Sequence, residues 1–184
     1  MRTHSLRRRL AAVALLPAVL ALGACGMKYD ITIHEGETVD VSVLMWGSGL
    51  SEEMCSQDST LSDTGYAMTS TFTEHDGQPA CESSATGLTL SQVNGEGDDI
   101  RITHEGGLYV LDADLGDVGG QASSYAELDS EGSSDFESTL TVTFPGEVTE
   151  ASGNAVISGR SVTWNLLEDS GALHAEGKDS ARLT

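Results

Sequence analysis

The stretch LTVTFPGEV, residues 140–148, alternates apolar and hydroxyl side chains over five residues and then turns at Pro145-Gly146. Such alternation is typical of a strand that buries one of its faces, and a proline beside a glycine commonly ends a strand. Three short segments of strand composition follow at 155–157, 161–166 and 173–176, with turn residues between them. This part of the chain therefore predicts a series of short strands.

The same alternation occurs directly after residue 25. It covers residues 27–33 and 39–43, and the interval between them has the length and the glycine of a hairpin loop. A second hairpin is expected from 100–104 and 108–115, and residues 66–73 also have strand composition. The alternate apolar residues of the first hairpin should face one core, namely Ile31, Ile33, Val39, Val41 and Val43.

Helical signals are few. Ser51 stands at an N-cap position before two glutamates, which favours a short helix over 52–57 that carries Cys55. Residues 121–129 have the only other helical spacing, and residues 88–93 fit either a helical turn or a strand. With about eight to ten short strands, about two short helices and no βαβ alternation, the sequence predicts a single α+β domain of mostly antiparallel β-sheet.

The first 24 residues have the parts of an export signal. Four arginines lie within residues 1–9, and residues 10–22 form an apolar run of thirteen interrupted only by Pro17. A membrane-spanning helix needs about 20 apolar residues, so this run favours a signal that is cleaved. Small residues then lead into Cys25.

The residues LGAC, 22–25, resemble the lipobox of bacterial lipoproteins. The resemblance implies cleavage after Ala24, a thioether-linked diacylglycerol on Cys25 and a further acyl chain such as palmitate on its amino group. Residues 1–24 would then be a lipoprotein signal peptide and residues 25–184 an extracytoplasmic domain. Two or more acyl chains anchor a protein firmly, so we expect attachment to the lipid bilayer on the outer face of the cell membrane. The alternative is an ordinary secretory signal that leaves Cys25 unmodified.

The mature chain is strongly acidic. Without residues 1–24, five basic residues remain against 29 acidic ones, a formal charge of 5 − 29 = −24. Such a surface repels nucleic acid and anionic membrane surfaces, so a nucleic-acid partner is excluded. The acidity is best interpreted as keeping an exported domain soluble.

Two cysteines remain beyond Cys25. Cys55 and Cys81 match no metal-binding or CxxC redox spacing. In an oxidising extracytoplasmic compartment an isolated pair predicts a disulfide.

One block resembles a known family. It runs TVTFPGEV at 141–148, crosses a polar stretch and resumes as GRSVTW at 159–164. A phenylalanine-proline-glycine turn, a polar loop and an arginine-led strand that ends in tryptophan resemble the LppM-type lipoprotein domain of actinobacteria. The resemblance extends to the lipobox, the immediate strand pair and the two later cysteines. It implies an envelope lipoprotein with a role in binding envelope lipids or glycolipids, although many members carry a C-terminal transmembrane helix and no apolar run stands before Thr184.

The residues of this block have structural roles on physical grounds. Phe144 should lie at the end of its strand with its side chain in the core, and Trp164 should also fill the core, because large aromatic side chains are usually buried. Arg160 is expected to pair with one of the many acids. None of these roles needs a ligand.

No motif for catalysis or a cofactor is present. The mature chain lacks GxSxG, SxxK, Walker and GxGxxG patterns, and no HExxH or HxH motif joins its four histidines, His34, His75, His104 and His174. The glycine-rich segment 95–99 carries three acids where a phosphate would have to lie, so it is expected to be a loop. We therefore predict a non-catalytic protein without cofactors. The alternatives are a hydrolase of envelope components that uses dispersed acidic residues, and a purely structural or interaction lipoprotein.

The best metal candidate is the group Asp112, Asp114 and Asp117. Its third acid lies one place late for an EF-hand, and no glutamate stands at the twelfth position. The first two acids alternate with Leu111 and Ala113, as on the solvated face of a strand. No metal site is therefore predicted.

The resemblance further suggests an apolar cavity between the sheet and a helix that binds lipid or glycolipid. The expected lining is Met45, Trp46, Met54 and Met68, since methionines adapt to irregular ligands. An acidic headgroup would need a local basic site around Lys28, Arg101 or Arg160. The competing expectation is a close-packed core without a cavity.

Overall fold

The computed structural model describes residues 25–56, 66–95, 100–114, 136–169 and 171–180. Several sequence-based predictions lie outside these ranges: the signal peptide, the helix over 121–129, loop residues 96–99 and Asp117. The described residues form eleven strands and two short helices. The domain is α+β and mostly antiparallel sheet, as predicted.

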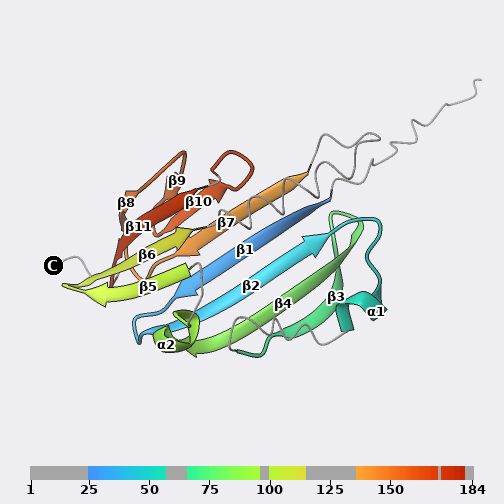
Figure 1. The fold of residues 1–184 in the computed structure, drawn as a ribbon, viewed down its shortest axis with the longest axis horizontal. Helices are drawn as coiled ribbons and strands as arrows, with labels where there is room; N and C mark the ends of the chain where they lie inside the picture. Colours follow the sequence, from blue (N-terminus) through green and yellow to red (C-terminus); the bar gives the residue numbers. More distant parts are fainter. Residues whose placement is uncertain (1–24, 57–65, 96–99, 115–135, 170, 181–184) are drawn as a thin grey trace, which may run out of the picture.

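Seven strands form the larger sheet (Figure 1). All neighbouring pairs are antiparallel except the central pair β1–β7, which is parallel. The sequence did not indicate this pair, because its strands are separated by about a hundred residues and no local pattern connects them. In spatial order the strands are β3 (Thr69–His75), β4 (Gln78–Thr89), β2 (Thr38–Trp46), β1 (Gly26–Ile33), β7 (Glu137–Thr143), β10 (Ser161–Asn165) and β9 (Val156–Ser158).

A smaller antiparallel sheet packs on one face of the larger one. Figure 1 shows it near the arrowhead of β1, away from the start of that strand. Contacts join the sheets there, since the Tyr109 hydroxyl donates to the carbonyl of His34 over 3.2 Å. Its strands are, in order, β5 (Ile100–Glu105), β6 (Leu108–Asp114), β11 (Ala172–Lys178) and β8 (Val148–Ala151). The two helices are α1 (Glu52–Ser56) and α2 (Leu90–Val93).

Burial of the first hairpin is uneven along its length. Ile31, Ile33 and Val39 are fully buried, as predicted. Val41 and Val43 share their face of the sheet, because they pair with Ile31 and with Tyr29, but they are only half-buried. The core is therefore complete only at the end of the hairpin that the smaller sheet covers.

Most of strand β4 was not predicted from the sequence, which indicated only the ambiguous segment 88–93 at its end. The strand lacks valine and isoleucine, and small serine and alanine side chains interrupt any apolar alternation. A bulge at Gly87, whose φ is +67°, shifts its register against β2, and the Gly87 N–H donates to the Asp40 carboxylate over 2.8 Å. The segment 88–93, which fitted either a strand or a helical turn, contains both. Its first two residues end β4 at Thr89, and Thr89 then caps the helix α2.

The Phe144-Pro145-Gly146 turn carries the chain from the larger sheet to the smaller one. Phe144 is fully buried, and a Cβ on Gly177 of β11 would overlap its ring. The Gly146 N–H donates to the carbonyl of Lys178 over 2.8 Å. Glycine at these two positions therefore lets the turn dock directly on the end of β11.

Arg160 corrects a prediction. The sequence predicted an ion pair, but the Arg160 Nη1 donates to the backbone carbonyl of Pro145 over 3.2 Å, and no carboxylate of a described residue lies within salt-bridge distance. The guanidinium thus braces the turn between the sheets. Trp164 is fully buried as predicted, and its indole N–H donates to the carbonyl of Ser152 over 2.9 Å, which ties β10 to the β8–β9 connection.

Candidate functional site

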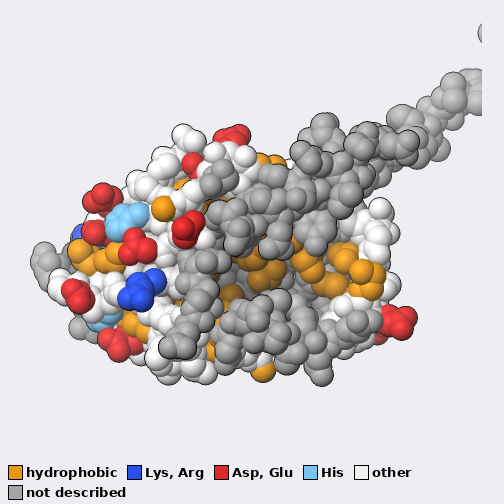
Figure 2. Space-filling model, viewed as in Figure 1, with side chains coloured by type: hydrophobic (Ala, Val, Ile, Leu, Met, Phe, Trp, Pro, Cys, Tyr) orange, Lys and Arg blue, Asp and Glu red, His pale blue; other side chains and the backbone are white. Residues whose placement is uncertain are grey.

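A row of apolar side chains on β1 and β2 lies beyond the part of the core that the smaller sheet covers. We call these residues the apolar strip: Met27, Tyr29, Val41, Val43 and Met45. Strand pairing places all five on the core face, where four are half-buried and Met45 is 36% exposed. Figure 2 shows hydrophobic side chains from the centre of this face to its right-hand end. Met27 and Tyr29 were not among the residues predicted to face the core, although their alternation with Ile31 and Ile33 indicates that they share this face.

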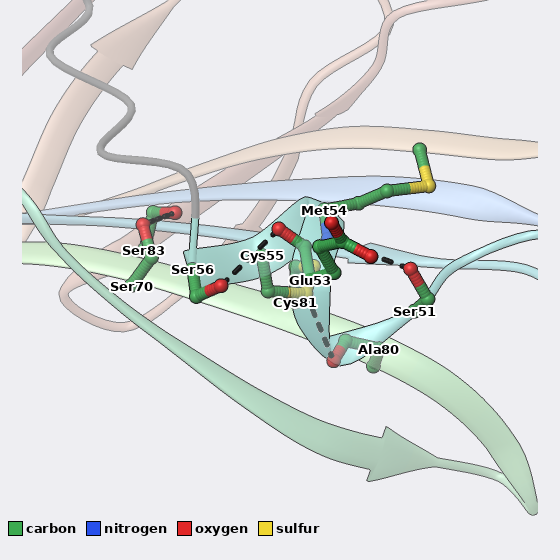
Figure 3. Close-up of a disulfide and its surroundings, with 9 residues drawn as sticks. All are labelled: Ser51, Glu53, Met54, Cys55, Ser56, Ser70, Ala80, Cys81 and Ser83. Atoms are coloured by element: carbon green, nitrogen blue, oxygen red, sulfur yellow. Dashed lines mark hydrogen bonds between the residues drawn. A yellow bond between two sulfur atoms is a disulfide. The ribbon is translucent and has the colours of Figure 1, made fainter.

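The helix α1 borders the strip on the β4 side. Cys55 of α1 is disulfide-bonded to Cys81 of β4, with 5.6 Å between their Cα atoms, and both residues are buried. This is the pair that the sequence predicted. Cys81 pairs with Met45 across β2 and β4, so the disulfide holds α1 beside the outer end of the strip (Figure 3).

The expected lining residues divide between two faces. Met45 belongs to the strip, Met68 packs against the core edge, and Met54 on α1 is 58% exposed. The prediction that Trp46 lines a cavity together with Met45 is wrong. Trp46 follows Met45 on a strand, so its side chain points to the opposite face. There it is buried, its ring lies 4.5 Å from that of His75, and it cannot line the same groove as Met45.

Cys25 lies at the outer end of the strip, one residue before β1 begins. Its carbonyl accepts a hydrogen bond from the Glu137 N–H over 3.2 Å, and β1 begins at the next residue. Trp46 crosses above that residue, Gly26, where any Cβ would overlap the indole ring. The residue predicted to carry lipid is therefore fixed to the sheet.

The four histidines that follow Cys25 in the sequence all lie beside carboxylates. His34 contacts Asp40 at 2.8 Å, and this contact, after the stronger bond from the Gly87 N–H, lowers the pKa of the Asp40 carboxyl. His174 contacts Asp112 at 2.8 Å, which raises the pKa of its imidazole. His75 stands 3.6 Å from the neighbouring Asp76.

His104 connects three parts of the chain. Its Nδ1 lies 2.9 Å from Glu37 in the β1–β2 turn, and its Nε2 lies 3.4 Å from Asp179 after β11. The Glu37 hydrogen bond is the main cause of a raised pKa for His104, and Asp179 adds to it. The ring also stacks on Tyr109, with 4.2 Å between the centroids. These contacts clamp the smaller sheet onto the larger one.

No metal centre forms among the described residues, where no three His, Cys, Asp or Glu side chains come together suitably. Asp112 and Asp114 are exposed and alternate with buried Leu111 and Ala113, as predicted for a solvated face. The basic residues Lys28, Arg101 and Arg160 lie on β1, on β5 and before β10, so they form no common site. No helix within the described ranges is both long and apolar enough to cross a bilayer.

A hollow of about 370 Å³ lies at the opposite end of β1 from the strip's outer end. Its walls combine apolar and polar side chains from the end of β1 and from the Phe144 turn, and they include Ile33, Phe144, Pro145, Glu35 and Arg160. It does not touch α1. It is therefore distinct from the apolar cavity between sheet and helix that the sequence analysis expected.

Comparisons with known proteins agree with this architecture. Residues 26–179 match the family described as the LppM domain. The NMR structure of the folded domain of LppM from Mycobacterium tuberculosis is similar, with a TM-score of 0.53, 20% sequence identity, and coverage of 86% of this chain and 94% of that chain. At this identity the likeness shows the fold alone. No curated protein matches the sequence.

Proposed function

We propose, on the premise that this chain belongs to the LppM domain family, that it is an envelope lipoprotein whose domain binds an acyl chain of an envelope lipid or glycolipid along the apolar strip. Lipid on Cys25 would hold the domain on the outer face of the cell membrane. The observation that carries the proposal is the strip itself, an apolar row that the smaller sheet leaves uncovered.

The chemistry of the strip supports an acyl chain as the ligand. Two methionines at its outer end adapt to irregular shapes, and the Tyr29 hydroxyl donates to the Met27 sulfur, so these side chains offer mainly apolar surface. An aliphatic chain laid along β1 and β2 would remove that surface from water. Burial of apolar area stabilises a complex by roughly 25 cal/mol per Å² before the costs of association.

A buried hydroxyl beside the strip adds to this support. Ser138 of β7 pairs with Met27 and is 1% exposed, and its Oγ has no hydrogen-bond partner among the described residues. A buried polar group without a partner costs about 1–3 kcal/mol. An ester or hydroxyl oxygen at the head of a bound lipid would supply the missing partner.

Charge favours an uncharged headgroup. The mature domain carries −24, and Lys28, the basic residue nearest the strip, points to the opposite face and lies 3.5 Å from Glu137. An anionic headgroup at the strip would therefore meet net repulsion. A glycosyl or other neutral headgroup avoids it.

The proposed role is binding without catalysis. Carboxylates that could serve acid–base chemistry, such as Glu37, Asp40 and Asp112, are each hydrogen-bonded to a histidine. A hydrolase that uses dispersed acids is the alternative. Release of fatty acid or sugar from lipid offered to the protein would favour that alternative.

Native mass spectrometry with envelope lipid extract tests lipid binding. The wild-type domain should retain lipid adducts, and Met45→Asp should lose most of them because it places a charge in the strip. Ile157→Asp is the matched control, since Ile157 is 50% exposed on the edge strand β9 and should leave binding intact. Absence of adducts from the wild-type protein would refute lipid binding.

Intact-mass measurement of the native protein tests the anchor. Cys25 should carry the mass of a diacylglycerol and an added acyl chain, and Cys25→Ser should release the protein from the membrane fraction or block its processing. A mature protein with an unmodified Cys25 contradicts the anchor, whatever the domain binds.

A further inference from the structure

Cys25 is held directly against the start of the larger sheet, so lipid attached to it would orient the domain on a membrane. Its carbonyl is bonded to Glu137, β1 starts at Gly26, and a Cβ on Gly47 would lie 3.2 Å from the Cys25 Cβ. No linker therefore stands between the proposed lipid attachment and the rigid fold. Lipid on this cysteine would bring one particular end of the larger sheet to the bilayer surface.

That end carries exposed apolar side chains. Met45, Phe72 and Met54 are 36%, 40% and 58% exposed, and they surround the Cys55–Cys81 disulfide: Met45 and Phe72 each pair with Cys81, and Met54 precedes Cys55. We call these three residues the end patch. Figure 3 shows the Met54 side chain extending away from the disulfide.

The end patch lies close to Cys25. Met45 is two residues from Gly47, the residue beside Cys25, which is about 7 Å along a strand. Phe72 lies two strands farther across the sheet, about 10 Å from Met45. Figure 1 shows α1, the end of β2 and the start of β1 at the same end of the molecule.

Leu167 places apolar surface on the other side of the anchor. It is 39% exposed and follows β10, whose last residue Asn165 pairs with Thr139 near the start of β7. Four of the six large apolar side chains exposed in the described residues are thus at this end. The other two, Val156 and Ile157, lie on β9 in line with the middle of β1.

We propose that the end patch and Leu167 form the membrane-contact surface of the domain and enter the boundary between headgroups and acyl chains of the bilayer that holds Cys25. This inference rests on the lipid attachment proposed above. Contact by such a surface comes from burial of apolar area. Attraction to anionic lipid does not contribute, because the patch is flanked by Glu52 and Glu53 of α1.

The domain is then held in one orientation, with the apolar strip starting at the bilayer. Met45 belongs to both the strip and the end patch, so the strip opens where the domain touches lipid. An acyl chain could pass from the bilayer onto β1 and β2 without crossing water. The end patch thereby supplies a route to the proposed binding site.

Depth-dependent quenching tests the proposal on the full-length lipidated protein in vesicles of phosphatidylcholine. Met54→Cys, Phe72→Cys and Leu167→Cys each provide one reactive thiol for an environment-sensitive fluorophore, because Cys25 would carry lipid and the other two cysteines form the disulfide. Ile157→Cys is the matched control, since Ile157 is comparably exposed but lies about 13 Å farther along the strand direction, level with Ile31. We expect doxyl groups placed near the headgroups to quench the three end probes at least about twofold more than the control probe.

The outcomes separate this inference from the anchor. Equal quenching at all four positions in protein that remains on the vesicles overturns the contact surface and leaves the anchor intact. A protein that leaves the vesicles because Cys25 is unmodified overturns both. Quenching of the end probes only when anionic lipid is added overturns the apolar mode of contact.

Discussion

The two ends of the larger sheet are built differently, although the same strands run through both. At one end, Ile33, Val39 and Phe144 are fully buried beneath the smaller sheet, and His104 and Arg160 brace the junction. At the other end, the apolar strip lies on the same strands, and α1 and the disulfide border it on the β4 side. We refer to these parts as the closed end and the open end.

This difference separates residues that hold the fold from residues available for a ligand. In the block that carries the family resemblance, from the Phe144 turn to Trp164, the aromatic side chains Phe144 and Trp164 are fully buried in the core. The open end has apolar side chains that remain partly exposed to water. An apolar surface of this kind is expected where a lipid or a membrane is bound.

Removal of Trp164 should cause the largest loss of stability. Trp164→Ala leaves a cavity between the sheets and removes the hydrogen bond to Ser152, so we expect it to lower the free energy of unfolding by about 3–5 kcal/mol. Met45→Ala at the open end is the comparison and should cost less than about 1 kcal/mol, since Met45 is already partly exposed. Urea denaturation followed by circular dichroism measures both. Equal losses would remove the distinction between the two ends.

Loss of the disulfide should have the next largest effect. The bridge closes a loop of 26 residues, so Cys55→Ala combined with Cys81→Ala should lower the free energy of unfolding by about 3.5 kcal/mol through the entropy of the unfolded chain. Both cysteines are replaced to avoid a reactive thiol. The same urea titration measures the loss, and reduction of the wild-type protein should reproduce it. A negligible change would mean that α1 is held at the open end by packing alone.

The pH dependence of the closed end should be the smallest effect. The pKa of His104 is raised in the folded state, mainly by Glu37, so its contribution to stability is complete below the unfolded pKa of about 6.5 and is lost as the pH rises through the higher folded pKa. For a partly exposed pair this contribution is below about 1 kcal/mol. Urea midpoints at acidic and alkaline pH should therefore differ less in His104→Gln than in the wild type.

A double-mutant cycle assigns this effect to one contact. Glu37→Gln removes the main cause of the raised pKa, so it should flatten the pH profile about as much as His104→Gln does. The combined variant should add little. Independent, additive effects would show that the two side chains do not act as a pair.

Local patterns predicted the strands whose two faces differ in polarity. Alternation identified β1, β2, β7 and β10, because one face of each meets the core over at least part of its length. It failed for β4, whose small residues pack without a strong contrast between faces, and for β8, whose four residues give too short a pattern. The cysteine count predicted the disulfide because only two candidates remained after Cys25.

The sequence by itself determined which residues are apolar, which turns break the strands and which cysteines pair, since these depend on local chemistry and on counting. Only the tertiary structure decided which apolar residues are buried. Val39 and Val43 lie on one face of the same strand, yet the smaller sheet covers the first and leaves the second half-exposed. That choice depends on the parallel pairing of β1 with β7, which joins segments about a hundred residues apart, and on the Phe144 turn, which carries the chain from the larger sheet into the smaller one. Burial is a property of what packs on a side chain, and a strand's own sequence does not contain it.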